Sequence, residues 1–270
     1  KYGAVVAYAV ANEKRARRES RGARSVITTE RTVAILQSNY IPWKGYFDII
    51  AAVDEFLIFD EAQFTRRDWR NRNKIVIAGK PHWLTIPVKS KGRFEAPIQE
   101  MEVDGPGWAE QHWKTIKHAY GKAAFFPRFA PLLEETYLCA ADLTRLSAIN
   151  ELFLRRIAGW LGLPTVFRHT DEVVRSTDNP TGRLVEICVA RSARVYVSGP
   201  AARDYIETTQ FEAVGVKLRY VNYAGYPVYD QKAEPFEHGV SIIDLLMRCG
   251  PEARGHLKSV RTRGGLLSDP

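Results

Sequence analysis

The order of hydrophobic and polar residues along the chain predicts strands alternating with helices. Short apolar runs at Thr32–Gln37 and Glu55–Phe59 predict buried strands, and the apolar spacing over Trp43–Val53 between them is helical. A strand, a helix and a strand within about thirty residues have the length of a βαβ unit. We therefore expect a parallel sheet where the folded part begins.

The middle of the chain predicts a hairpin followed by helices. The runs Lys74–Ile77 and His82–Val88 are joined through a turn that contains Gly79, so they predict an antiparallel pair, and Pro97–Val103 predicts another strand. Helical spacing follows over Trp108–Tyr120 and Asp142–Leu161. The last third alternates again, with strands at Thr165–Arg168, Arg194–Val197 and Lys217–Val221 and helices at Thr181–Ala190, after Pro200 and at Ser241–Arg248.

These elements predict an α/β fold with a mainly parallel sheet, an antiparallel hairpin and a helical middle segment at about residues 105–162. We expect a basic flexible arm at residues 1–31, one α/β domain at 32–255 and a tail at 256–270. The sequence contains no apolar stretch long enough to predict a membrane span. Three cysteines without Cys-x-x-Cys spacing predict neither disulfides nor a zinc site, which favours a reducing cytoplasm.

The net charge of +8 is concentrated in two segments. Residues 1–31 carry eight Lys and Arg against three Asp and Glu, and residues 66–93 carry nine Lys and Arg against Asp68 alone. The rest of the chain is net negative. Because the excess is local, a phosphate-bearing small molecule explains residues 66–93 as well as nucleic acid does.

Two loops that follow predicted strands carry the residues best suited to bind an anion. In the first, Asn39 offers an amide, Lys44 a cation and Gly45 a close approach of the backbone, although Trp43 and Tyr46 could equally be core residues. The second, residues 60–74, combines Arg and Asn side chains with Phe64 and Trp69. Arginine forks bind phosphate, amides orient polar groups and aromatic faces stack on rings.

A third loop begins with Ser198 and Gly199 before a predicted helix and carries Arg203 one turn further on. Ser241 and Asp244 fit a helix cap, so we interpret them as structural. No two histidines have metal-ligand spacing, and no metal site is expected. The motifs of serine hydrolases, P-loop kinases and dinucleotide dehydrogenases do not occur.

Several blocks of this sequence resemble the WbqC-like family. They are VAILQSNYIPWKGYFDIIAAVDEFLIFDEAQFTRRDWRNRNKI, HWLTIPV, RLVEIC, YVSGPAARDYI and FEHGVSIIDLLMRCG, which lie within residues 32–255. The resemblance implies a role in bacterial surface-polysaccharide (O-antigen, lipopolysaccharide) biosynthesis, as a glycine or other aminoacyl transferase that acts on an amino sugar.

A more distant similarity connects the first loop to the HIGH-type nucleotidylyltransferases, whose two histidines bracket a glycine and hold nucleotide phosphates. It implies a Rossmann-like, nucleotidylyltransferase/HUP-like sheet with a nucleotide cleft. The matching positions here are Trp43, Lys44, Gly45 and Tyr46, so both histidines are missing.

The leading hypothesis is a transferase that moves an acyl or aminoacyl group to the amine of a nucleotide-linked sugar. A nucleotide or an activated acyl donor would be its cofactor. The expected catalytic residues are Asp60, Asp68 and Lys44, and the expected substrate contacts are Asn39, Tyr40, Trp43, Gln63, Arg67, Trp69, Arg70, Asn71, Arg72, Asn73, Ser198, Gly199 and Arg203. Among these, Asp60 or Asp68 would be the base, and the backbone of Ser198 and Gly199 would stabilise the oxyanion.

Two other hypotheses remain open on the sequence. One is a nucleotidylyltransferase-like enzyme that activates an acid or a sugar phosphate and releases pyrophosphate. The other is a binder of nucleic acid or polysaccharide without catalytic activity, which would use the arm and residues 66–93.

Overall fold

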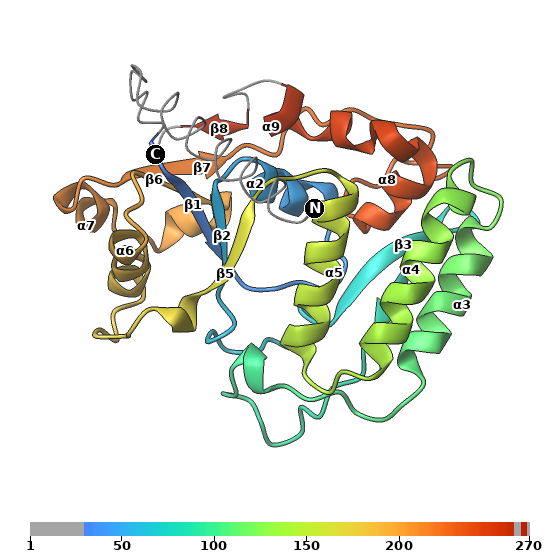
Figure 1. Ribbon diagram of the computed structural model, residues 1–270, viewed down its shortest axis with the longest axis horizontal. Helices are drawn as coiled ribbons and strands as arrows, with labels where there is room; N and C mark the ends of the chain where they lie inside the picture. Colours follow the sequence, from blue (N-terminus) through green and yellow to red (C-terminus); the bar gives the residue numbers. More distant parts are fainter. Residues whose placement is uncertain (1–29, 262–265, 269–270) are drawn as a thin grey trace, which may run out of the picture. The chain divides into compact units, whose positions relative to one another are not determined.

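The computed structural model describes residues 30–261 and 266–268. Its central sheet has six strands in the order β5-β2-β1-β6-β7-β8 (Figure 1). All neighbouring pairs are parallel except β7 and β8. The strands are β1 (Thr32–Leu36), β2 (Glu55–Ile58), β5 (Val166–His169), β6 (Val195–Ser198), β7 (Lys217–Val221) and β8 (Leu267–Ser268).

Helices cover both faces of this sheet, because successive strand residues point to opposite sides. Val33 and Ile35 of β1 pack in one apolar cluster with residues of α6 and α7, whereas Ala34 packs in the other with residues of α2 and α8. These helices are α2 (Lys44–Ala51), α6 (Pro180–Ala190), α7 (Thr208–Ala213) and α8 (Ile242–Cys249), and the short α9 (Lys258–Arg261) contacts α2. Burial on both faces explains why the inner strands β1, β2 and β6 are short, mostly apolar runs.

The helical middle segment consists of α3 (Trp108–Tyr120), α4 (Phe126–Ala141) and α5 (Leu146–Trp160). The predicted helix at Asp142–Leu161 begins only at Leu146, because the chain first makes a turn after α4. Sequence reasoning did not separate α4, which contains Pro131 in its interior. Prolines weaken a helical pattern, although packing against α3 and α5 is sufficient to hold this helix.

The predicted hairpin is confirmed as β3 (Arg72–Ile77) paired antiparallel with β4 (Lys80–Thr85) in a separate two-stranded sheet. The predicted strand at Pro97–Val103 is wrong. Residues Ile98–Glu100 form a turn of 3₁₀ helix, and the segment makes only isolated bridges to neighbours. Its apolar residues Ile98 and Met101 are buried by this compact turn, so the apolar run reflects burial and not a strand.

The connections place a crevice at the carboxyl end of β1. From β1 the chain proceeds to β2 and β5 on one side, then crosses to β6 and β7 on the other. The loops that follow β1 and β6 therefore diverge at adjacent strands. In open α/β sheets such a point is where ligands bind.

The mixed α/β fold with a mostly parallel sheet and an antiparallel hairpin is thus confirmed. The expected arm at residues 1–31 lies almost entirely outside the described residues. In the described ranges no helix has the length and apolar character needed to cross a membrane.

Candidate functional site at the carboxyl ends of β1 and β6

Hydrogen bonds join the loop after β1 to the segment after β2. The backbone N–H of Tyr40 donates to the Trp69 carbonyl (3.1 Å), and Asn73 Nδ2 donates to the Tyr40 carbonyl (3.1 Å). Asn150 from α5 donates to both segments, at Ser38 Oγ (3.0 Å) and the Arg70 carbonyl (2.9 Å). The two loops therefore form one rigid unit.

The backbone of this unit is strained at Ile41, where φ is 36°. A β-branched side chain disfavours the left-handed region, and such conformations cost of order 1–3 kcal/mol. Ile41 is fully buried, so packing holds it in place. This sharp bend separates Asn39 from Trp43 and leads into α2, which begins at Lys44.

Asp60 anchors the same loop from the end of β2. Its carboxylate accepts the Ser38 backbone N–H (2.8 Å) and the Ser38 hydroxyl (2.7 Å). Burial raises the pKa of Asp60, and these two bonds act in the opposite direction. Only 4% of the Asp60 surface is exposed, so this buried carboxylate stabilises the loop from the protein interior.

Arg70 lies at the centre of the unit. Its guanidinium donates to the side-chain oxygens of Gln37 and Asn39, and Asp68 Oδ2 lies 3.6 Å away. Its Nε is buried and has no hydrogen-bond partner among the described residues. The side chain is 14% exposed, and this cation is surrounded by two neutral amides and by the nearby carboxylates of Asp68 and Asp60.

Asp68 is ionised beside Arg70. Burial alone would raise the pKa of its carboxyl group, but bonds from Thr65 Oγ1 (2.6 Å) and the Trp69 N–H (2.7 Å), together with nearby arginines, outweigh burial and hold the pKa below its usual value.

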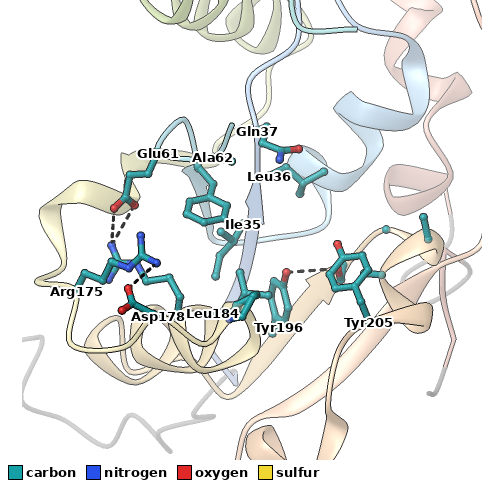
Figure 2. Close-up of a pocket in the computed structure, with 17 residues that line it drawn as sticks. Ile35, Leu36, Gln37, Glu61, Ala62, Arg175, Asp178, Leu184, Tyr196 and Tyr205 are labelled. Atoms are coloured by element: carbon teal, nitrogen blue, oxygen red, sulfur yellow. Dashed lines mark hydrogen bonds and ion pairs between the residues drawn. The ribbon is translucent and has the colours of Figure 1, made fainter. Parts of the chain in front are cut away.

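A cavity of about 490 Å³ opens where β1 and β6 end. Gln37, Glu61, Tyr196 and Tyr205 lie around it in Figure 2, and Ser198 and Gly199 belong to the same lining. The Tyr196 hydroxyl donates to Ser198 Oγ (3.3 Å). We call this space the switch-point cavity.

Arg183 of α6 closes one wall of the switch-point cavity. Its side chain is 3% exposed and donates to Glu61 (3.1 and 3.2 Å) and to the carbonyls of Thr170 (2.8 Å) and Val173 (3.0 Å). Helix α6 begins beside the cavity after Asn179, whose side chain caps the Gly182 N–H (2.7 Å). Arg183 therefore ties α6 to the loops that follow β2 and β5.

A second cavity, of about 280 Å³, lies beside the start of α2. Its lining includes Asn39, Trp43, Trp69, Asn73 and Gly239, and we call it the aromatic cavity. Gln37 lines the switch-point cavity and Asn39 the aromatic cavity, and both bind the Arg70 guanidinium. Arg70 itself is in neither lining, but it links Gln37 of one lining to Asn39 of the other.

Gly45 explains how Trp43 becomes a wall of the aromatic cavity. A Cβ at position 45 would meet the Trp43 indole at 2.2 Å, so the ring lies directly over the glycine backbone. Edge contacts with Tyr223 (4.9 Å between centroids) and Tyr226 (5.7 Å) fix its other side. The spacing Trp-Lys-Gly thus serves close packing of the indole.

Lys44 occupies an aromatic cage behind the aromatic cavity. Its Nζ lies 5.0–5.4 Å from the ring centroids of Tyr226, Tyr229 and Phe236 and donates to the Pro227 carbonyl (3.5 Å). Burial lowers the pKa of Lys44 from its ordinary 10.5 to about 8, although the charge of Asp244 acts in the opposite direction.

We predict a stability signature for Lys44. Between pH 8 and 10.5 the folded protein releases this proton while the unfolded chain keeps it, so the free energy of unfolding gains a contribution that rises with pH. Below pH 8 the cost of burying the charge is fully present. Urea denaturation at pH 7, 8, 9 and 10 should show the wild type gaining stability relative to Lys44→Met above pH 8. A constant difference between the two proteins would refute the assignment.

Other residues expected at the site support it or lie away from it. Tyr40 is fully buried, with its hydroxyl 2.6 Å from that of Tyr137 and 3.0 Å from His112 Nδ1. Asn71 is buried and donates to the Ile86 carbonyl (2.8 Å). Like Arg70, Asp68, Asp60 and Lys44, four more of the expected residues lie outside both cavity linings. They are Gln63, which bonds the Phe94 carbonyl, Arg67, which is exposed, Arg72, which stacks on Trp83, and Arg203, which stacks on Tyr220.

The charge excess of residues 66–93 is partly neutralised by acidic residues from elsewhere in the fold. Lys74 pairs with Glu237 (3.0 Å), Lys89 with Glu102 (3.0 Å) and Arg93 with Glu100 (3.6 Å). These pairs reduce the long-range attraction that a nucleic-acid surface needs.

Sequence reasoning missed Gln37, Glu61, Arg183 and Tyr196. Each becomes a site residue through the strand order, which brings the ends of β1 and β6 and the start of α6 together. A local signal was present at Asn179-Pro180, which is typical of a helix start facing a loop.

Comparison with known proteins agrees with the sequence blocks described above. A family model described as "WbqC-like protein family" matches residues 37–256. The chain belongs to the WbqC-like family. This WbqC-like protein is 43% identical over 229 residues to "Uncharacterized protein Rv1507c" of Mycobacterium tuberculosis (strain ATCC 25618 / H37Rv), a match that covers 85% of this chain and 98% of the relative. No solved structure matches it.

Proposed function

We propose that this WbqC-like protein is a transferase that binds a nucleotide-linked amino sugar across the two cavities and acylates or aminoacylates its amine. A role in bacterial surface-polysaccharide biosynthesis is what the family resemblance implies. The observation that carries the proposal is the pair of bonds by which Arg70 links Gln37, of the switch-point cavity, to Asn39, of the aromatic cavity. A guanidinium with spare donors in a half-closed site suits a diphosphate.

The strand order supports a nucleotide at this edge. Counting only the parallel strands, the order is third, second, first, fourth, fifth, as in Rossmann-like doubly wound sheets. We propose that the fold is Rossmann-like and of the nucleotidylyltransferase/HUP type. A cavity of about 490 Å³ falls within the size range of small-molecule sites and accommodates a nucleoside.

In the proposed reaction the sugar amine attacks the carbonyl of an activated acyl donor. A C–N bond forms, the bond from the carbonyl carbon to the leaving group breaks, and the amine loses one proton. Asp68 is ionised beside Arg70, and we assign it as the carboxylate that orients the amine and accepts the proton. Ser198 and Gly199, expected from the sequence to stabilise the oxyanion, line the switch-point cavity and are assigned to the nucleoside instead.

Asp60 and Lys44 become positioning residues in this proposal. Asp60 holds Ser38 and with it the loop that carries Gln37 and Asn39. Lys44 is enclosed by three rings and a carbonyl, so it contributes to the shape of the wall behind Trp43. A reducing compartment such as the cytoplasm suits the three free thiols.

Calorimetry on Arg70→Ala tests the proposal. The variant should bind nucleoside diphosphate hexoses about 10- to 100-fold more weakly than the wild type, because charged hydrogen bonds to phosphate are lost. Arg66→Ala is the matched control, since Arg66 belongs to the same segment but is exposed and bonds Ser90 (3.0 Å). Equal affinities for the wild type and Arg70→Ala would remove the proposal. Release of pyrophosphate from a nucleoside triphosphate would favour a nucleotidylyltransferase instead.

A further inference from the structure

Trp43 and Trp69 form walls of the aromatic cavity, and the proposed function does not say which part of the substrate binds there. We infer that it receives the pyranose ring of the nucleotide-linked substrate, with the apolar C–H face of the sugar stacked on the Trp69 indole. This inference rests on the proposed function, because it takes the diphosphate at Arg70 as its starting point. The nucleoside then occupies the switch-point cavity and the sugar the aromatic cavity.

Both aromatic walls are held before any ligand arrives. Trp43 lies over the Gly45 backbone, and the Trp69 backbone is fixed by the Tyr40 N–H. The Trp69 side chain is 39% exposed and rests against Trp83, with 5.4 Å between ring centroids. A rigid, partly exposed indole binds a ring at low entropic cost.

The charges around Trp69 decide which kind of ring fits. Lys74 Nζ lies 5.9 Å from the Trp69 centroid and 5.8 Å from that of Trp83, and Arg72 lies 4.2 Å from the Trp83 centroid. Cations flank the indole pair, although Glu237 neutralises part of the Lys74 charge (3.0 Å). They disfavour an ammonium group at this face and favour an uncharged ring, which includes an amino sugar whose amine is in the unprotonated form that attacks the acyl donor.

The contacts of Asn39 also indicate in which direction the ligand lies across the site. Asn39 lines the aromatic cavity and its side-chain oxygen is bound by Arg70, which leaves the amide nitrogen to face polar groups of the ligand. A phosphate bound by Arg70 is therefore close to Gln37 of the switch-point cavity and to Asn39 of the aromatic cavity. The smaller cavity, of about 280 Å³, suits a single six-membered ring.

The test compares UDP, ADP, GDP and dTDP with their hexose derivatives by calorimetry. The wild type should bind at least one hexose derivative about tenfold more tightly than the corresponding nucleoside diphosphate. Trp69→Ala should lose that advantage and keep its affinity for the bare nucleoside diphosphate, whereas Trp69→Phe should keep most of it. Phe94→Ala is the matched control, because Phe94 is an exposed aromatic residue (65%) outside the cavity lining, and it should behave as the wild type.

Each other outcome overturns the inference in a recognisable way. If Trp69→Ala weakens bare nucleoside diphosphates as much as their hexose derivatives, the nucleoside occupies the aromatic cavity and the proposed function stands. If hexoses bring no advantage in the wild type, the sugar lies elsewhere. If no nucleoside diphosphate binds at all, the proposed function falls as well. Thermal unfolding of each variant confirms that a loss of binding is not a loss of fold.

Discussion

Replacing Asp244 with alanine is expected to lower the free energy of unfolding by about 3–5 kcal/mol. Asp244 is fully buried in α8 and accepts hydrogen bonds from the hydroxyl groups of Tyr120 (2.9 Å) and Tyr229 (2.7 Å). Gln231 donates to it as well (3.2 Å), and Arg248 Nε lies 3.9 Å away. Removing the carboxylate leaves several buried donors without an acceptor and a cation without its nearest counter-charge, which costs more than the bonds themselves.

Urea denaturation of Asp244→Ala measures this effect, with Asp104→Ala as control. Asp104 is exposed, so its replacement should change the free energy of unfolding by less than about 0.5 kcal/mol. Because Tyr229 is one of the rings around Lys44, the variant should also loosen the wall behind Trp43. A loss for Asp244→Ala as small as that of the control would show that the tyrosine hydroxyls find other acceptors.

Replacing Asp60 with alanine is expected to cost about 2–4 kcal/mol of stability and to weaken ligand binding in parallel. The substitution leaves the buried Ser38 N–H and hydroxyl without their acceptor. The loop after β1 then loses the anchor that places Gln37 and Asn39 around Arg70. Denaturation and calorimetry on the same preparation provide both numbers.

The substitution Asp60→Asn distinguishes a positioning role of Asp60 from a catalytic one. If Asp60 positions the loop, Asp60→Asn keeps one acceptor oxygen, so stability and affinity should recover together and kcat should follow them. If Asp60 were instead the base, Asp60→Asn would bind ligand normally and lose kcat alone. That second result would return Asp60 to the catalytic role expected from the sequence.

Much of the fold was predictable because the sheet is buried on both faces. The runs at β1, β2 and β6 are continuous and mostly apolar, and a parallel sheet between helix layers requires that pattern. The errors lie where buried residues do not form the element that their spacing along the chain predicts. Ile98 and Met101 are core residues on a compact turn, and α4 carries a proline that packing tolerates.

The candidate site was predictable only in part, because local sequence does not give side-chain direction. Arg67, Arg70 and Arg72 are neighbours in sequence, but Arg67 has a positive φ (58°) and Arg72 begins β3, so the three side chains diverge. Only Arg70 reaches the loop after β1. Arg183 and Tyr196 come to the site from elements far along the chain, which requires the strand order.

A crystal structure of the protein with the tightest-binding nucleoside diphosphate hexose tests the central claim most directly. In that complex the diphosphate should lie within hydrogen-bond distance of the Arg70 guanidinium, the nucleoside beside Tyr196 and Ser198, and the hexose against Trp69. A ligand seated instead on the outer face of the β3–β4 hairpin, with Arg70 still bonded only to Gln37 and Asn39, would contradict it.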